Sequence, residues 1–331
     1  MKKIKIGMLG AARIGNWAMV QPSSKVPDAE LYAVAARDPQ RAKEYAKKYR
    51  IPVVHDSYEA LLADTQIDAI YNPLPNGYHC EWTIRALDAG KHVLCEKPFA
   101  NNASQAELMR QAAQRNNRVL LEAFHYRFHP MAQEMKDAVK QLGKISRIET
   151  NMCAPIYDKK DIRYNYSLGG GATMDVGAYT LHLMRALADT ALDKTMADLP
   201  EVVEATPILF NEKVDRAMKA SFRWPDGMTG AIHCSMWSMA LIKISAHVYG
   251  SRGELHVLNP FGPHMWNRFT LIVDGKATTK RVQGGATYTY QLEYFLKQIR
   301  QGSPDHSALI DSVYNMRLID NVYTRAGLPL R

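Results

Sequence analysis

The first 124 residues alternate short runs rich in Val, Ile, Leu and Ala with amphipathic stretches, and this alternation constrains the fold more than any other feature. The runs typical of strands are residues 3–9, 31–36, 69–72, 91–95 and 119–123. The stretches between them are long enough to be the helical crossovers that parallel strands require. The alternation therefore predicts βαβ units and an N-terminal, doubly wound parallel sheet of the α/β class over residues 1–124.

After a helical stretch at residues 131–142 the rhythm changes, and from about Ile145 one strand pattern follows another. Tight-turn signals separate these patterns, namely Pro-Asp-Gly at 225–227, Ser-Arg-Gly at 251–253 and Asp-Gly at 274–275. Asp and Gly tolerate the positive φ that hairpin turns need, so the signals indicate antiparallel pairing. Two helical patterns close the chain. Residues 125–331 are therefore expected to form an α+β domain around an open, mostly antiparallel sheet.

Apolar residues alternate along this expected sheet, for example at Met218, Ala220 and Phe222 and again at Ile232 and Cys234. A face of this kind must be covered, and either a second subunit or a helix layer of the same chain could cover it. The sequence leaves both coverings open.

The chain has 331 residues, enough for two domains that each bury a core. Charge or glycine interrupts its apolar runs well before the roughly 20 residues of a membrane span, so we expect no signal peptide and no membrane partner. The cysteines stand far apart, without a C-x-x-C pair or a partnering histidine, at Cys80, Cys95, Cys153 and Cys234. This spacing predicts free thiols in a reducing cytoplasm and no metal site.

Lys and Arg exceed Asp and Glu, 42 to 33, which gives a formal net charge of +9. The basic residues are scattered and do not interleave with aromatic residues, so a nucleic-acid partner is not expected. A positive field that gathers an anionic cofactor or substrate explains the surplus, as does a simple contribution to solubility.

The first strand pattern runs into Gly10-Ala11-Ala12-Arg13-Ile14-Gly15, where a helical pattern begins. Gly10 permits a tight turn, Gly15 lets helix and strand pack closely, and the helix N-terminus offers N–H groups to a pyrophosphate. Ala12 stands where the usual fingerprint has its middle glycine. Plain strand-turn-helix packing is the alternative, but the βαβ context favours a dinucleotide cofactor bound by Gly10, Ala12, Arg13, Ile14 and Gly15.

The second strand pattern ends in Arg37-Asp38, with Arg41 one helical turn later. An arginine at this position suits the 2′-phosphate of NADP, whereas an acidic residue suits the ribose of NAD. We therefore expect Arg37 and Arg41 to favour NADP. Asp38 either caps the following helix or binds the ribose, which would permit use of NAD as well.

Two further motifs carry proton-handling side chains. The fourth predicted strand ends in Glu96-Lys97-Pro98, and the carboxyl ends of such strands form the ligand crevice, so Lys97 is placed for substrate chemistry. Asp175, Tyr179 and His182 follow three glycines and fall at i, i+4 and i+7, on one face of a predicted helix. The structural alternatives are a surface Lys-Pro turn and a solvated helix face with a core tyrosine.

These motifs together resemble the glucose-fructose oxidoreductase and inositol dehydrogenase (Gfo/Idh/MocA) family, over essentially the whole chain. The resemblance rests on the phosphate loop and on five further segments: YNPLPN at 71–76 with His79, AGKHVLCEKP at 89–98, EAFHYRFHP at 122–130, the triple glycine at 169–171 and AGLP at 326–329. Within the family the chain is most similar to NADP-dependent dihydrodiol and D-xylose or glucose dehydrogenases. The Asp161-Ile162-Arg163 segment also resembles sugar and keto-sugar-nucleotide oxidoreductases.

The resemblance implies a role for each motif. It implies that Lys97 lies beside the reacting hydroxyl, that Tyr179 occupies the acid/base position and that Asp175 orients substrate or tyrosine. It implies cofactor contacts by Pro73, Leu74, Asn76, His79, Glu96 and Lys97 and substrate contacts by His125, Arg163 and His182. His125 and His182 depart from the residues expected there, which puts substrate specificity in doubt. The family also implies homodimers or homotetramers.

The expected function is hydride transfer between NADP(H) and a hydroxyl or carbonyl carbon of a sugar or diol. The hydroxyl proton needs an acceptor within hydrogen-bond reach, and we expect Tyr179 to accept it while the ammonium of Lys97 holds the oxygen and favours the tyrosinate. Three alternatives remain open. They are a keto-sugar-nucleotide reductase, a redox-neutral NAD-dependent glycoside hydrolase and an NADP(H)-sensing regulatory protein without chemistry.

Overall fold

The structure, a computed structural model, describes residues 2–194, 198–302, 304 and 306–331. Its contacts divide the chain into two compact units. Unit 1 comprises Met1–His125 and Tyr288–Val313, and unit 2 comprises Tyr126–Thr287 and Tyr314–Arg331. Among the described helices, none combines the length and the apolar character needed to cross a membrane.

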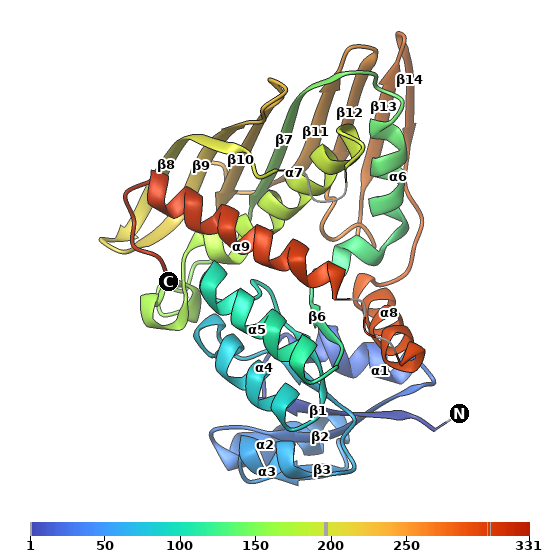
Figure 1. Cartoon of the computed structure of the whole chain (residues 1–331), viewed down its shortest axis with the longest axis vertical. Helices are drawn as coiled ribbons and strands as arrows, with labels where there is room; N and C mark the ends of the chain where they lie inside the picture. The colour runs from blue at the N-terminus through green and yellow to red at the C-terminus, as the bar shows by residue number, and fades with distance from the viewer. Residues whose placement is uncertain (1, 195–197, 303, 305) are drawn as a thin grey trace. The chain divides into compact units, whose positions relative to one another are not determined.

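Unit 1 is built on a six-stranded parallel sheet with the order β3-β2-β1-β4-β5-β6. Its strands are β1 (Ile4–Leu9), β2 (Ala29–Ala35), β3 (Val53–His55), β4 (Ala69–Asn72), β5 (His92–Cys95) and β6 (Leu120–Glu122). The α-helices are α1 (Gln21–Lys25), α2 (Pro39–Tyr49), α3 (Tyr58–Ala63), α4 (His79–Asp88), α5 (Ala103–Arg115) and α8 (Thr287–Gln301), all labelled in Figure 1. The strand order reverses between β1 and β4, so the predicted doubly wound parallel sheet is confirmed.

One strand and one helix of unit 1 were not predicted. β3 has three residues, all of them half-buried, and α3 has six residues, so neither is long enough to show a clear hydrophobic period. The strand that ends before Glu96 is therefore the fifth strand of the sheet, and its prediction as the fourth was wrong.

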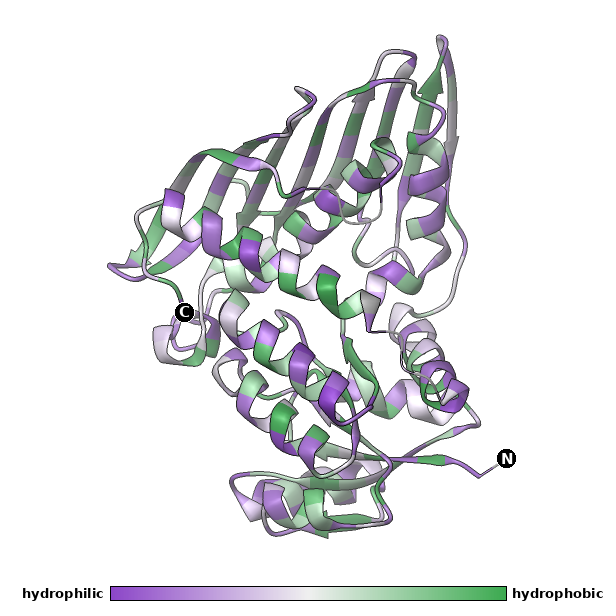
Figure 2. Cartoon of the chain, in the orientation of Figure 1, coloured by the Kyte–Doolittle hydropathy of each residue, from purple (hydrophilic) through white to green (hydrophobic). Residues whose placement is uncertain are grey.

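Unit 2 is built on an eight-stranded sheet with the order β14-β13-β12-β11-β7-β10-β9-β8. Its strands are β7 (Ile145–Cys153), β8 (Glu201–Asn211), β9 (Val214–Arg223), β10 (Thr229–Ser235), β11 (Lys243–Gly250), β12 (Gly253–Leu258), β13 (Arg268–Val273) and β14 (Lys276–Lys280). β7 and β10 run parallel, and the other described pairs are antiparallel, as predicted. All three predicted turns connect consecutive antiparallel strands. Hydrophobic and hydrophilic residues alternate along the strands (Figure 2).

Helices of the same chain cover the apolar face of this sheet. The helix α7 (Ala178–Ala191) packs on β7 and β10, and α6 (Pro130–Val139) packs beside it (Figure 1). Met218, Phe222 and Cys234 on this face are at most 1% exposed. The helix layer is therefore the covering for this face, whereas the opposite face carries polar side chains such as Lys219 and His233. The last helix, α9 (Ser307–Arg325), begins in unit 1 and ends in unit 2.

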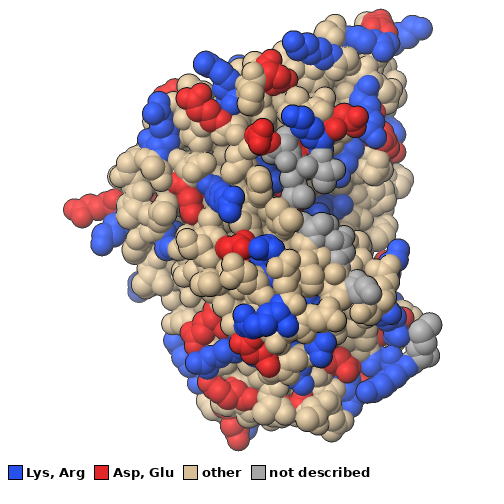
Figure 3. All heavy atoms as spheres, viewed as in Figure 1, with Lys and Arg blue, Asp and Glu red and all other residues tan. Residues whose placement is uncertain are grey.

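Charged side chains of both signs are interspersed on the face of the molecule shown in Figure 3, and no continuous basic stripe is visible there.

Candidate active site

The phosphate loop of unit 1 has the predicted geometry at both glycines. Gly10 has φ +84°, which favours glycine, and its N–H donates to the carbonyl of Ala35 at 2.7 Å. A Cβ at Gly15 would lie 2.7 Å from the Tyr45 hydroxyl and 2.8 Å from the sulfur of Met8. The loop therefore needs Gly10 for its turn and Gly15 for the close packing of helix and strand.

The backbone of this loop presents donors for an anion. Within the described part of the chain, the N–H groups of Ala11, Ala12 and Ile14 have no hydrogen-bond partner. The carbonyl of Ala12 instead accepts from Gly15 N at 3.1 Å and from the Tyr45 hydroxyl at 3.3 Å, which fixes the loop. Unpartnered N–H groups that converge at the end of β1 fit the pyrophosphate of a dinucleotide.

The helix after the loop begins differently from the prediction. A π-helical turn spans Asn16–Val20, and the α-helix α1 follows only at Gln21. A π turn holds one residue more than an α turn, and sequence periodicity does not reveal it. Trp17 lies on this turn and is 60% exposed, so a large aromatic surface lies next to the phosphate loop.

At the end of β2, Asp38 caps helix α2. Its carboxylate accepts from the N–H of Gln40 at 2.9 Å and of Arg41 at 3.4 Å, which is the capping role considered from the sequence. The Arg41 guanidinium donates to the carbonyl of Ala11 at 3.4 Å, so it lies beside the phosphate loop. Arg37 and Arg41 are both exposed, and each guanidinium could meet a phosphate at this edge.

His79 connects two segments at the carboxyl edge of the sheet. Its ring is fully buried, and its two nitrogens lie 2.8 Å from the carbonyls of Leu74 and Pro98. Burial lowers the pKa of His79 to about 4, against the two carbonyls, which favour the protonated ring. The ring is therefore neutral at pH 7. The backbone next to the ring includes the predicted cofactor contact Leu74, so we expect any effect of His79 on a cofactor to act through that segment.

Lys97 directly follows β5 and a buried carboxylate. Glu96 is 8% exposed and accepts a hydrogen bond from the Tyr71 hydroxyl at 2.7 Å, while burial and Glu96 raise the pKa of Tyr71. Burial first, and then Glu96, also raises the pKa of Tyr288, whose ring packs 4.1 Å from the ring of His125. Glu96 and His125, both predicted from the sequence, thus lie around two tyrosines.

In unit 2, Asp175 pairs with Arg163. The Nε of Arg163 donates to Asp175 at 2.9 Å, and its Nη1 donates to Asp161 at 3.1 Å. Both carboxylates, Asp175 more than Asp161, raise the pKa of Arg163 against its burial. The structure therefore brings together the predicted Asp175 and Arg163 as one charged cluster.

Tyr179 and His182 belong to an aromatic cluster. Both side chains are buried, at 5% and 4% exposure, so a solvated helix face is excluded. The Tyr126 hydroxyl hydrogen-bonds to Nδ1 of His182, and the ring centroids of Tyr126 and Tyr179 are 6.1 Å apart. Phe261 packs against both tyrosines, at 5.2 Å and 5.5 Å.

The expected single α-helix through Asp175, Tyr179 and His182 is interrupted. Thr173–Gly177 form a π-helical turn, and the α-helix begins at Ala178. Asp175 thus lies on a different kind of turn from the other two residues. The prediction of one uninterrupted α-helix is therefore wrong, and the common face of the three side chains stays a prediction.

The triple glycine before this turn packs against a buried ionic cluster that sequence reasoning missed. Asp215 is fully buried and accepts from the N–H and the hydroxyl of Thr173, from the Tyr323 hydroxyl at 2.9 Å and from Arg331 at 3.2 Å. Asp215 is the one acidic residue of β9, and basic and polar residues on the same strand, such as Arg216 and Lys219, hid it as a signal. Tyr126 was also missed, although it lies within the motif at 122–130.

Comparison with known proteins identifies the chain's family. Residues 4–124 match an oxidoreductase family with an NAD-binding Rossmann fold, and residues 132–256 match the GFO/IDH/MocA C-terminal domain. The chain is 32% identical over 323 residues to D-xylose 1-dehydrogenase (NADP(+)) 2 from Haloferax volcanii, covering 97% of this chain and 96% of that protein. It is 28% identical over 338 residues to trans-1,2-dihydrobenzene-1,2-diol dehydrogenase from Xenopus tropicalis, covering 98% of both.

Solved structures agree with the sequence comparison. A crystal structure of a 3-ketoreductase from Actinomadura kijaniata, in complex with NADP and TDP-benzene, matches with a TM-score of 0.88 at 26% identity over 98% of each chain. The predicted fold class and the resemblance are both confirmed. This chain belongs to the GFO/IDH/MocA family of NAD(P)-dependent oxidoreductases.

Proposed function

We propose that the chain transfers a hydride between NADP(H) and a hydroxyl or carbonyl carbon of a sugar or diol. Residues 1–124 would bind the dinucleotide, and residues 125–331 would supply substrate contacts and subunit contacts. The observation that carries the proposal is the set of unpartnered N–H groups in the phosphate loop together with Arg37 and Arg41 at the end of β2. The named activities of the D-xylose and dihydrodiol dehydrogenases support the substrate class.

The chain's own residues would manage the proton. The nicotinamide, when bound, supplies or accepts the hydride. Tyr179 would take the proton from the reacting hydroxyl, and the ammonium of Lys97 would hold the same oxygen and stabilise a tyrosinate. In the direction of reduction the tyrosine would return that proton to the oxygen. The matching structures include a tyrosine-to-phenylalanine variant and two lysine variants of the ketoreductase. They support the choice of a tyrosine and a lysine as the residues to test here.

Substrate would be positioned by residues that already have fixed partners. Asp175 holds the Arg163 guanidinium at 2.9 Å, so the arginine is oriented before any sugar hydroxyl arrives. Tyr126 fixes the ring of His182 in the same way. Preorganised donors of this kind reduce the entropic cost of binding. His125, packed on Tyr288, would complete the set of substrate contacts.

The test is turnover of Tyr179→Phe and Lys97→Ala with saturating NADP(H) and a panel of aldoses, diols and inositols. Each variant should lose about 100-fold or more in kcat, because general acid-base catalysis normally contributes that much. Tyr249→Phe and Lys276→Ala, outside the proposed site, are the matched controls and should retain activity. A loss below about tenfold in either site variant would remove that residue from the mechanism.

A keto-sugar-nucleotide reductase is the second candidate. The ketoreductase match supports it, as does 36% identity over 186 residues, 56% of this chain, to dTDP-3,4-didehydro-2,6-dideoxy-alpha-D-glucose 3-reductase from Saccharopolyspora spinosa. Product analysis with a nucleotide-linked keto sugar separates the two candidates. A redox-neutral glycoside hydrolase would instead show turnover without a net change in NAD(P)H absorbance, and a regulatory protein would show no turnover.

We also propose that the chain forms a homodimer or homotetramer in the cytoplasm. Large apolar side chains are exposed on the segment between β10 and β11, with Met239 at 97% and Ile242 at 71%, and burial between subunits would remove them from water. The four free cysteines suit a reducing compartment. Light scattering of the purified chain would measure its oligomeric state, and a monomer at micromolar concentration would contradict the assembly.

A further inference from the structure

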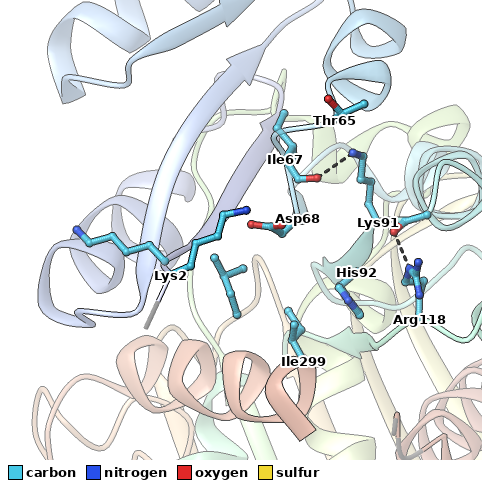
Figure 4. A pocket seen from close by; sticks show the side chains of 11 residues that line it. Lys2, Thr65, Ile67, Asp68, Lys91, His92, Arg118 and Ile299 are labelled. Carbon is cyan, nitrogen blue, oxygen red and sulfur yellow. Dashed lines mark hydrogen bonds between the residues drawn. The ribbon is translucent and has the colours of Figure 1, made fainter. Parts of the chain in front are cut away.

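A cavity of about 430 Å³ lies in unit 1 at the edge of the parallel sheet opposite the phosphate loop (Figure 4). It is lined by residues at or just before the amino ends of β1, β4, β5 and β6, including Ile4, Asp68, His92 and Arg118. Since the strands are parallel, their carboxyl ends all point the other way, and a six-residue strand such as β1 spans about 20 Å. The cavity is therefore separate from the proposed cofactor crevice.

Lys91 brings a buried ammonium to this cavity. The residue is 7% exposed, and its Nζ donates to the carbonyls of Asp64 at 2.7 Å and Ile67 at 2.8 Å. An ammonium has three N–H donors, so one donor remains without a partner in the described structure. Burial lowers the pKa of Lys91, against Asp64 and Asp68, which raise it. An anion in the cavity would satisfy the third donor.

His92 and Arg118 add donors from the next two strands. Nδ1 of His92 accepts from the N–H of Val119 at 3.0 Å, so a neutral ring must carry its proton on Nε2. Arg118 donates to the carbonyls of Gly90 at 2.6 Å and Asn117 at 3.1 Å through Nε and Nη1. No hydrogen bond of its Nη2 or of His92 Nε2 is found among the described residues. Three side chains thus keep unused donors at one cavity.

The charge of the lining also favours an anion. Four cationic side chains, Lys2, Lys3, Lys91 and Arg118, line the cavity together with one carboxylate, Asp68, which accepts from the backbone N–H of Lys5 at 2.9 Å. Asp68 lies across from Lys2 (Figure 4). The cations therefore outnumber the carboxylate, and an anion would meet a net attractive field.

We propose that this cavity is a second binding site, distinct from the cofactor crevice, for a small molecule that carries a phosphate group. A phosphate offers several acceptor oxygens to the unused donors of Lys91, His92 and Arg118. The cavity is larger than one phosphate ion, which leaves room for the organic part of a phosphate ester. Free phosphate and a phosphate ester share this chemistry, and the ester should bind more tightly because it fills more of the cavity.

Titration calorimetry of the full chain tests the site, with NADP at saturation so that the cofactor crevice is occupied. The probes are inorganic phosphate, glycerol 3-phosphate and, as the uncharged control, glycerol. We expect binding of one phosphate-bearing probe per chain and none of glycerol. Arg118→Ala should weaken binding by about tenfold or more, since it removes a charge-assisted hydrogen bond. Lys276→Ala, an exposed lysine of unit 2, is the control and should bind as the wild type does.

Lys2→Ala/Lys3→Ala provides a second test that does not depend on a buried side chain. Both lysines are exposed, so the double variant should fold, and it should bind a few-fold more weakly, with less dependence on salt. Binding should also raise the pKa of His92, which lies at about 4 because of burial and Arg118, as followed by NMR. Unchanged affinity in the cavity variants, or no saturable binding at millimolar phosphate, would overturn the proposal. Failure to bind NADP would contradict the proposed function but would not affect the proposal for this cavity, which is tested by the phosphate-bearing probes alone.

Discussion

Two glycine-rich segments, one in each unit, use glycine for opposite purposes. In the phosphate loop, Gly10 and Gly15 shape a turn in which the N–H groups of Ala11, Ala12 and Ile14 have no partner in the described chain. In the segment 169–171, the glycine N–H groups donate to Tyr166, Asn165 and Arg163 carbonyls at 2.9–3.0 Å. The first segment leaves three donors unused by the described chain, and the second uses its donors to hold its own backbone.

The surroundings of the two segments differ in the same sense. The phosphate loop is at most half-buried between residues 11 and 14, whereas Gly170 and Gly171 are buried. A Cβ at Gly171 would lie within 3 Å of Asp215, Tyr323 and Arg331. A glycine-rich sequence alone therefore does not indicate a ligand site, because the same residue type also permits a backbone to pack against a buried ionic cluster.

The largest expected effect is on the stability of the second segment. Gly171 has φ +141° and no room for a Cβ, so Gly171→Ala should lower the free energy of unfolding by about 3 kcal/mol or more. Gly227→Ala is the matched control, with φ +88° and nothing within 4 Å, and should cost only about 1–2 kcal/mol of backbone strain. Urea denaturation measures both. Equal losses of unfolding free energy in the two variants would show that the ionic cluster can shift to accommodate a methyl group. The contrast between the two glycine segments would then be weaker.

The two units also differ in what holds these segments in place. A buried ionic cluster around Asp215 packs against the glycine segment 169–171, whereas a neutral histidine, His79, lies between the Leu74 and Pro98 carbonyls in unit 1. Unfolded histidine binds a proton below pH 6.5, whereas folded His79 binds one only below about 4. Between these two pH values the unfolded state binds more protons than the folded state. The contribution of His79 to the free energy of unfolding is therefore complete above pH 6.5 and falls by about 3 kcal/mol as the pH drops to 4.

His79→Gln tests this source of pH dependence. The variant should be less stable at pH 7, since it loses the buried ring, but its stability should fall less steeply between pH 6.5 and 4. Unfolding free energies measured across this range give both slopes. A variant slope as steep as that of the wild type would assign the acid sensitivity to other groups.

Cofactor preference should respond to Arg37. Replacing it by alanine removes a charge-assisted hydrogen bond to a 2′-phosphate, worth about 1.5–3 kcal/mol, so the ratio of kcat/KM for NADP over NAD should fall about 10- to 150-fold. Lys47→Ala, an exposed cation on the same helix as Arg41, is the control for a general loss of positive charge. An unchanged ratio would leave the preference to Arg41 or to other contacts.

The smallest expected effect concerns Ala12, the position at which the fingerprint usually has glycine. Ala12→Gly removes one methyl group and allows closer approach to the pyrophosphate, while it adds flexibility that costs about 0.5–1 kcal/mol. We expect NADP to bind up to about fivefold more tightly, as measured by fluorescence titration. Weaker binding would show that the methyl group helps to fix the loop.

Much of the architecture follows from local patterns. Hydrophobic period and strand-helix alternation located five of the six strands of unit 1, and the glycine fingerprint predicted close packing at Gly15, which the structure shows against Tyr45 and Met8. The three-residue strand β3 escaped because so short a segment shows no period. The π turns at Asn16–Val20 and Thr173–Gly177 escaped because each adds one residue to an otherwise helical pattern.

By itself, the sequence determined the fold class and the phosphate loop and named candidates for proton transfer, since these depend on residue type and on spacing along the chain. Only the tertiary structure decided which partners they have: Arg163 for Asp175, Tyr126 for His182 and the carbonyls of Leu74 and Pro98 for His79. It also decided that helices of the same chain cover the apolar sheet face. These pairings join residues from different elements, and no local pattern encodes a contact made by packing.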